Sequence, residues 1–379
     1  MQIDEAARRE FASTKAGEGY EFPEIGETLT DDLAEPVRER KYTIDRLHPA
    51  GGNSLLVAQF KAGKTTLLLN LLRALADRQP FLGQFDVTPL DGRVAFWNYE
   101  LDDDMFRDWM RDVGVENPDR VARPLHLRGR VLRLWEPAVA ETVIEWLKGS
   151  EVEFLIVDPV ARAWRGLVTD ENDNAQVAAF TDALDTIKRE AGVRDLVLST
   201  HMGRATFDEG AERARGATRL EDWMDAGWYL SKDRDRRALH ANGRDVDLEA
   251  IDLDYDEMRR HVSSTGRTRT ERRLDDGVQS AIDALALAGE PMVTSKLEEA
   301  MPGTKASRNG LILQAVAAGL ITRTYEDGTP VDESIKSSGK SKLCSLTEEG
   351  NRRHQRKVEP PKKKPVRKIK TTRGKRRVR

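Results

Sequence analysis

The sequence has a single cysteine, Cys344, which excludes an internal disulfide and a cysteine-based zinc site. Its six histidines are scattered singly, without the spacing of metal ligands. No apolar run approaches the ~18 residues of a membrane span, and the best one, Leu67–Ala76, contains Asn70 and Arg73. The first residues are charged and lack the apolar core of a signal peptide. We therefore expect a soluble, cytoplasmic protein with no membrane partner.

The net charge of −3 conceals an uneven distribution along the chain. Residues 352–379 contain 15 Lys or Arg and one acid, Glu359, so this segment carries +14 and the rest of the chain −17. The segment is also interrupted by prolines. This composition predicts a disordered basic tail that contacts the phosphates of a polyanion such as DNA.

The length of 379 residues favours two or three domains. Residues 1–40 are polar and without a convincing period, which indicates a flexible N-terminal arm. Over residues 41–265, short apolar runs alternate with longer helical patterns, and this predicts an α/β domain with a parallel sheet between helices. The expected strands are Ser54–Ala58, Arg93–Asn98, Phe154–Asp158, Asp195–Thr200 and Gly227–Leu230. The expected helices are Thr65–Ala76, Asp102–Val113, Pro137–Lys148 and Ala175–Ala191.

The pattern changes over residues 266–351, where three helical stretches precede a pair of strand-like runs. The helical stretches are Glu271–Ala288, Ser295–Met301 and Ser307–Ala318, and the strand-like runs are Leu320–Tyr325 and Ser341–Leu346. Three helices followed by a two-stranded wing predict a winged-helix domain. Its third helix would be the recognition helix, and Lys305 and Arg308 near its start are candidate DNA contacts. Winged helices also serve as protein docking modules.

The strongest motif is a P-loop that lies between an expected strand and a leucine-rich helix. Gly63 allows close approach of the backbone, Lys64 reaches the β- and γ-phosphates, and the Thr65 hydroxyl ligates Mg²⁺. A chance Gly-Lys-Thr in a turn is the other interpretation, and the strand and helix around it argue against that. The predicted nucleotide-binding residues are Ala58, Gln59, Phe60, Lys61, Ala62, Gly63, Lys64, Thr65 and Thr66.

Two acids at the ends of expected strands complete a predicted ATPase site. Asp158 ends an apolar strand about 95 residues after the P-loop and supplies a second anchor for Mg²⁺. Glu100, just beyond the strand that ends at Asn98, is placed to orient the attacking water and accept its proton. The three aspartates after it are helix N-terminal acids, and Glu100 could be one more of these.

His201 follows the strand Asp195–Thr200, where a polar strand end can sense the γ-phosphate and relay its loss. Taken alone, a single histidine is more simply a structural residue.

The order P-loop, Glu100, Asp158 and His201 resembles the RecA-fold hexameric ATPases. Within these, the chain resembles the RepA-like replicative helicases, which are related to the DnaB type. Further residues resemble the sequence pattern of these helicases: Pro80-Phe81-Leu82-Gly83, Gly92–Phe96, Arg215-Gly216-Ala217-Thr218 and Asp225-Ala226.

The resemblance spans about residues 42–232 and implies ATP and Mg²⁺ as ligands, with Thr65 and Asp158 at the metal. It implies a homohexameric ring with a basic finger from the neighbouring subunit, for which Arg215, Lys232 and Arg234 are candidates. A solvated surface pair is the other interpretation of the last two. The loop Gly203–Ala214 would face the ring channel, where Arg204 and Arg213 would contact single-stranded DNA. A charged surface loop without a ligand is the alternative.

The sequence therefore predicts an ATP-hydrolysing nucleic-acid motor with a RecA-like core. The ring-forming DNA helicase of a replicating phage or plasmid fits best, with replication proteins as further partners. A RecA-like recombination or loading ATPase that does not unwind DNA is one alternative. Another is a DNA-binding regulator that responds to ATP, although Glu100 argues against it because a sensor needs no water-activating acid.

Overall fold

The computed structural model describes residues 28–34, 41–202, 218–233, 236–332 and 341–358. The chain divides into two units, Met1–Lys41 and Tyr42–Arg379. In the first unit the described residues form one short helix, α2 (Leu29–Ala34), within the segment predicted to be a flexible arm. No helix among the described residues is both long and apolar enough to cross a membrane.

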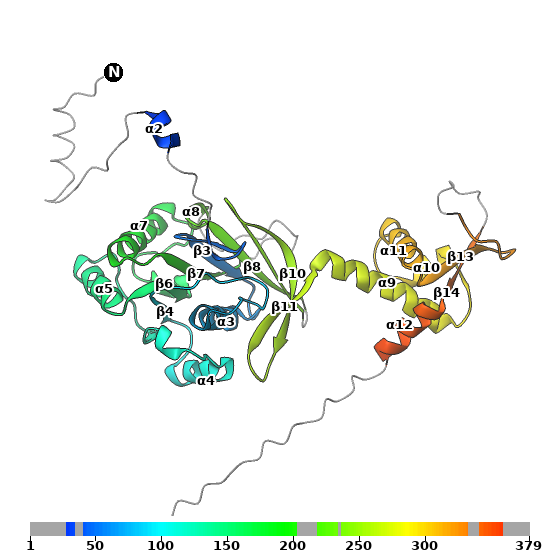
Figure 1. The fold of residues 1–379 in the computed structure, drawn as a ribbon, viewed down its shortest axis with the longest axis horizontal. Helices are drawn as coiled ribbons and strands as arrows, with labels where there is room; N and C mark the ends of the chain where they lie inside the picture. The colour runs from blue at the N-terminus through cyan, green and yellow to red at the C-terminus, as the bar shows by residue number, and fades with distance from the viewer. Residues whose placement is uncertain (1–27, 35–40, 203–217, 234–235, 333–340, 359–379) are drawn as a thin grey trace, which may run out of the picture. The chain divides into compact units, whose positions relative to one another are not determined.

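A nine-stranded sheet lies at the centre of the second unit (Figure 1), in the order β11-β10-β9-β8-β3-β7-β6-β4-β5. Neighbours from β8 to β5 are parallel, whereas β8 to β11 pair antiparallel. The parallel part contains β3 (Asn53–Ala58), β4 (Arg93–Asn98), β5 (Leu125–His126), β6 (Val152–Asp158), β7 (Asp195–His201) and β8 (Ala226–Asp233). The predicted parallel sheet is therefore present, and a short ribbon, β1 (Tyr42–Ile44) with β2 (His48–Pro49), precedes it.

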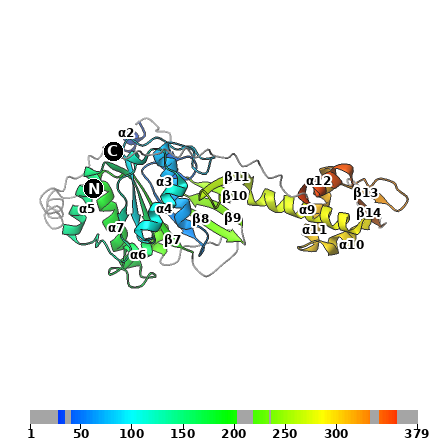
Figure 2. The same cartoon turned by 90° about the horizontal axis from the view of Figure 1, so that it is seen from below.

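Helices cover both faces of the parallel strands, as Figures 1 and 2 show. Leu55 and Val57 of β3 belong to one buried core and Leu56 to the other, because successive side chains of a strand point to opposite faces. The Leu56 core includes residues of α3 (Lys64–Asp77) and α4 (Asp103–Val113), and the other core includes residues of α5 (Pro137–Gly149) and α7 (Asn174–Ala191). Shorter helices are η1 (Pro118–Arg120), α6 (Val160–Ala163) and α8 (Thr218–Trp223).

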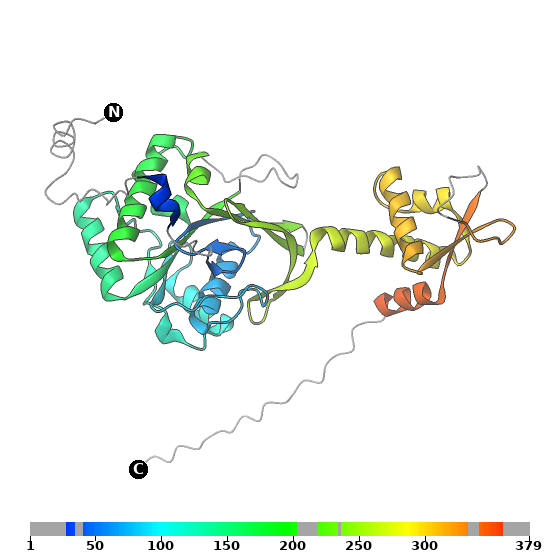
Figure 3. The same ribbon diagram turned by 45° about the horizontal axis from the view of Figure 1, so that its top comes forward.

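The antiparallel extension of the sheet was not expected from the sequence. It consists of β9 (Arg236–Gly243), β10 (Asp247–Asp256) and β11 (His261–Thr268), and the whole twisted sheet is seen from another side in Figure 3. Register shifts interrupt the pairing of β10 with both of its neighbours. Such bulges break the strict alternation of apolar and polar residues by which a half-buried strand is recognised.

The C-terminal part begins with α9 (Arg269–Ala288), directly after β11. It continues with β12 (Met292–Val293), α10 (Thr294–Ala300), α11 (Lys305–Ala317), β13 (Ile321–Tyr325), β14 (Lys342–Leu346) and α12 (Glu348–Val358). The strands form a three-stranded antiparallel sheet in the order β12-β14-β13. A third core, which includes the fully buried Cys344, lies between this sheet and the helices.

Part of the predicted disordered tail is a helix. α12 extends to Val358, because its cations pair with acids that the sequence reading had not placed beside them. Arg353 is 2.5 Å from Asp275 and Lys357 is 2.8 Å from Asp283, both on α9. Residues 359–379 lie outside the described part of the chain.

Candidate nucleotide site

The carboxyl ends of five parallel strands bring the predicted site residues to one edge of the sheet. Ala58, the last residue of β3, pairs with His201 of β7 on one side and with Leu230 of β8 on the other. Asp158 of β6 lies opposite Asn98 of β4. Loops that follow carboxyl ends of parallel strands are the usual ligand sites of open α/β sheets.

The P-loop connects β3 to α3 through a turn that requires glycine. Gly63 adopts a φ of 103°, a value that residues with a side chain rarely take, and Lys61 is left-handed with a φ of 60°. Gly63 stands at the N-cap of α3, where no side chain caps the helix. The first N–H groups of α3 are thus available to an anion, and the helix dipole favours negative charge there. Phe60 of the same loop is 78% exposed.

Lys64, Thr65 and Asp158 form a buried cluster at the start of α3. The Lys64 Nζ lies 2.5 Å from one carboxylate oxygen of Asp158, and the Thr65 hydroxyl donates to the other at 2.6 Å. Ser199 of β7 donates to Asp158 at 2.5 Å, and the Lys64 Nζ donates to Ser199 Oγ at 3.2 Å. Burial alone would raise the pKa of Asp158, but the Lys64 charge and these hydrogen bonds outweigh it and hold that pKa below its usual value.

This cluster fits a magnesium–phosphate ligand by its chemistry. A hydroxyl and a carboxylate are hard oxygen ligands, and Mg²⁺ is usually held by one or two protein groups together with phosphates and water. No group of three or more His, Cys, Asp or Glu side chains able to hold a metal occurs in the described ranges, so a cage made only of protein is not present there. The Lys64 ammonium is a compact cation of the kind that binds phosphate as a point charge.

Glu100 lies in the turn between β4 and α4, and its side chain is 34% exposed. Its carboxylate is 3.9 Å from the Nε of Arg162 on α6. The three aspartates after it act as predicted: Asp102 caps α4 by accepting from the Met105 N–H, and Asp103 and Asp104 occupy its first turn. Glu100 is separate from that capping arrangement, because none of the described contacts of the α4 cap includes it.

His201 and Lys232 also lie at this edge, each partly exposed. His201 is the last residue of β7, and the Lys232 backbone N–H donates to the Gln59 side chain of the P-loop at 2.8 Å. Among the DNA-contact candidates, Lys305 is the exposed first residue of α11 and Arg308 is half-buried in its first turn. The remaining candidates, Arg204, Arg213, Arg215 and Arg234, lie outside the described residues.

Two residues beside the P-loop were missed by the sequence reading. Arg237 of β9 donates through Nε to the Ala62 carbonyl at 2.9 Å, and its guanidinium lies 4.5 Å from the ring centre of Tyr255 on β10. Both line an open cavity of about 600 Å³ next to the P-loop, together with Lys232 and Arg272. They belong to the unpredicted antiparallel extension, so no motif in the sequence pointed to them.

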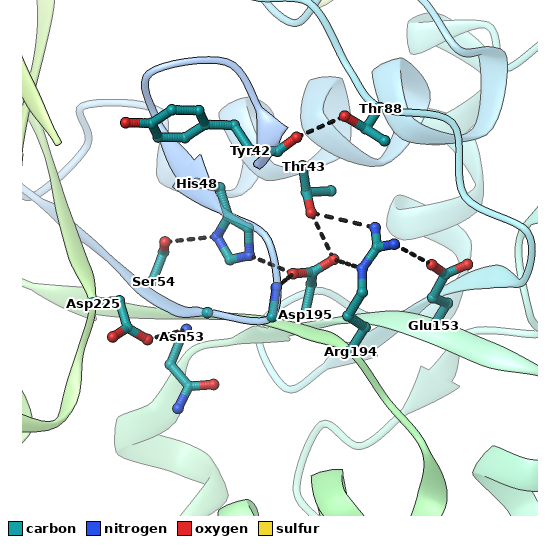
Figure 4. A network of polar contacts seen from close by, with 12 residues as sticks. Tyr42, Thr43, His48, Asn53, Ser54, Thr88, Glu153, Arg194, Asp195 and Asp225 are labelled. Atoms are coloured by element: carbon teal, nitrogen blue, oxygen red, sulfur yellow. Dashed lines mark hydrogen bonds and ion pairs between the residues drawn. The ribbon is translucent and has the colours of Figure 1, made fainter. Parts of the chain in front are cut away.

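A second polar network lies at the opposite, amino ends of the strands (Figure 4). His48 bridges Ser54 at 2.7 Å and Asp195 at 3.1 Å, and Asp195 also accepts from Thr43 and Arg194. A serine, a histidine and an aspartate that are linked in series by hydrogen bonds are the components of a nucleophilic triad. Here all three side chains are completely buried, so no substrate reaches them, and the network holds the strand ends together instead.

Part of the chain matches a known protein family. Residues 20–206, just under half of the chain, match the model of a family described as an AAA domain. Comparison with the curated proteins finds no match. Many solved structures are similar, and one of them is the RadB recombinase, at 12% identity and a TM-score of 0.40. That likeness covers 56% of this chain and 90% of the recombinase chain, and it is too distant to assign a function. The family match and the sheet support a RecA-like P-loop ATPase core.

Proposed function

We propose that this protein binds ATP with Mg²⁺, hydrolyses it, and uses the reaction to move along or remodel DNA. The observation that carries the proposal is the cluster of Lys64, Thr65 and Asp158 at the start of α3, with Glu100 on the neighbouring strand end. If Lys64 and Asp158 formed only a structural ion pair, the fold would not need the turn at Gly63, the uncapped start of α3 or the nearby acid Glu100. A phosphate site with a water-activating base uses all of them.

Each group has a role that follows from its position. The N–H groups of α3 and the Lys64 ammonium would hold the phosphates, and the Thr65 hydroxyl and Asp158 would hold the metal. Bound Mg²⁺ neutralises charge on the phosphate oxygens. Glu100 would orient the attacking water and accept its proton. The cavity lined by Arg237 and Tyr255 offers room for the base and ribose beside the P-loop.

The nucleic-acid part of the proposal rests on the C-terminal half of the chain. The order of α9, β12, α10, α11, β13 and β14 supports the proposal of a winged helix, in which Lys305 and Arg308 would lie at the start of the third helix. Beyond Val358 the sequence adds eleven Lys or Arg, which favour phosphate contacts. We infer a DNA helicase that works as a ring, with Arg215, Lys232 or Arg234 completing the site of a neighbouring copy.

The test combines ATP turnover with strand displacement on a forked DNA duplex. The wild-type protein should hydrolyse ATP faster with single-stranded DNA, displace a strand only with hydrolysable ATP, and sediment as a multimer when nucleotide is bound. Lys64→Ala should lose turnover, whereas Glu100→Gln should bind ATP and turn it over about 10²–10⁴-fold more slowly. Unchanged turnover in Glu100→Gln would remove that residue from the reaction. Stimulated turnover without displacement would replace the helicase by a remodelling ATPase.

A further inference from the structure

The ends of β4 and β6 are joined by contacts that hold the backbone at Glu100 in one place. The Tyr99 N–H donates to the Asp158 carbonyl at 2.9 Å. The buried Asn98 side chain accepts from the N–H groups of Glu100 at 3.2 Å and Leu101 at 2.9 Å. It also donates to the Leu101 carbonyl at 2.9 Å. The backbone of the turn that carries Glu100 is therefore tied by hydrogen bonds to Asn98 and to the end of β6.

Arg162 contacts this turn from the segment that follows Asp158. Its Nη1 donates to the Tyr99 carbonyl at 3.3 Å, and its Nε lies 3.9 Å from Glu100 Oε2. A guanidinium is a planar fork whose donors have a fixed geometry, so a group anchored on the backbone can orient a neighbouring carboxylate. Arg162 is on α6, four residues after Asp158 and one helical turn past the strand end.

We propose that Arg162 is a positioning residue that holds the Glu100 carboxylate in the orientation needed for water activation. The inference rests on the proposed ATP hydrolysis and deepens it. Because Arg162 and Asp158 belong to one short segment, the orientation of the Glu100 carboxylate would depend on the position of Asp158, the acid that would hold the metal. A shift at Asp158 would thus be transmitted to Glu100 through Arg162.

The exposure of this ion pair makes its role separable from folding. Arg162 is 37% exposed and Glu100 34% exposed, and ion pairs that are open to water contribute little to stability. An Arg162→Ala protein should therefore fold, and its kinetics would report on positioning. Arg165→Ala is a matched control, because Arg165 is an exposed arginine in the segment just after α6.

The experiment measures ATP turnover, KM for ATP and nucleotide affinity for Arg162→Ala, Arg162→Lys and Arg165→Ala. We expect Arg162→Ala to lower kcat by about 10- to 100-fold, the loss that misplacement of a reacting group causes. Nucleotide affinity should stay within about twofold, since the loss falls on the reaction step and not on binding. Arg162→Lys should be intermediate because it keeps the charge without the fork, and Arg165→Ala should match the wild type.

The double variant separates positioning from an independent effect. If Arg162 acts through Glu100, adding Arg162→Ala to Glu100→Gln should cause no further loss of kcat. Wild-type kcat in Arg162→Ala, or a full additional loss in the double variant, would overturn the positioning role while leaving the proposed ATPase in place. A wild-type protein without ATP turnover would overturn both.

Discussion

Asp195 is a charged side chain that is fully buried at the amino end of β7. Burial alone would raise its pKa, but the hydrogen bonds and charges of His48 and Arg194 outweigh burial and hold that pKa below the usual value. The Gly51 N–H donates to the same carboxylate at 2.8 Å. A carboxylate with this many partners stabilises the fold while it is ionised, and removing its charge leaves its neighbours uncompensated.

We expect Asp195→Asn to lower the free energy of unfolding by about 3–5 kcal/mol at pH 7, as is typical when one partner of a buried pair is removed. The folded-state pKa of Asp195 lies below its unfolded value, so its contribution is complete above the unfolded pKa. That contribution is lost as the pH falls through the folded-state pKa. Below about pH 4 the wild type should lose stability more steeply than Asp195→Asn.

Urea unfolding at pH 7 and at several acid pH values measures both effects. Asp104→Asn is the control, because the Asp104 side chain is 94% exposed in the first turn of α4 and the loss of its charge should cost at most about 1 kcal/mol. Parallel pH profiles for the wild type and Asp195→Asn would contradict the role given to this carboxylate.

Some residues of the candidate site could be predicted from the sequence, and others could be located only in the folded structure. Lys64 and Thr65 were predicted because they belong to the P-loop motif, and Asp158 because it ends an apolar strand at a suitable distance from that motif. Arg162 and Arg237 could not be predicted, since their contacts depend on the pairing of β4 with β6 and of β3 with β8, which are strands far apart in sequence. The Ser54, His48 and Asp195 network was missed for the same reason.

At the scale of elements, α9 and α11 pack closely at Gly277. A Cβ added to Gly277 would lie 2.5 Å from a methyl carbon of Leu311, so this glycine permits the approach of the two helices. Gly310 of α11 is different, because a Cβ there would meet nothing within 4 Å. The two glycines therefore allow a matched comparison in one part of the fold.

We expect Gly277→Ala to destabilise the C-terminal part by about 1–3 kcal/mol, the usual result of overpacking. Gly310→Ala should stabilise it by about 0.5–1 kcal/mol, since alanine is the better helix former and meets no obstruction. Hydrogen exchange of α9 and α11 amides measures both, and ATP turnover without DNA should not change in either. Equal protection in the two variants would show that Leu311 moves aside without cost.

The elements that the sequence predicted are those with an undisturbed pattern. β3, β4 and β6 are continuous apolar runs and were predicted within one or two residues. β10 and β11 were missed because bulges interrupt the first, and polar residues that face solvent make up most of the second. The extension of α12 to Val358 was missed because ion pairs to α9, and not an apolar face, hold its cations.

At the scale of the whole molecule, one part of the basic C-terminal segment belongs to the helix α12 and the other part lies outside the described residues. Four of its fifteen cations, Arg352, Arg353, Arg356 and Lys357, make ion pairs with acids of α9 or α12. The other eleven follow Val358 in sequence. These eleven are the cations on which sequence-independent DNA affinity should depend.

If about six phosphates are neutralised, DNA affinity should fall on the order of 10³-fold between 50 and 200 mM salt. A chain that ends at Val358 should keep its nucleotide affinity and lose most of this salt dependence. A full-length chain with glutamine in place of those eleven cations is the control that separates charge from length. The measurement is the slope of log affinity against log salt, and equal slopes in all three proteins would exclude the tail as the DNA contact.

The buried position of Cys344 has a practical consequence for optical measurements. It is the only thiol of the chain, and its side chain has no exposure to solvent. Maleimide dyes should therefore leave the native protein unlabelled, and a cysteine introduced at an exposed site would carry the dye alone. Pairs of such sites, one in the ATPase core and one on α11, would allow energy transfer to follow the distance between the two parts during turnover, without first removing a native cysteine.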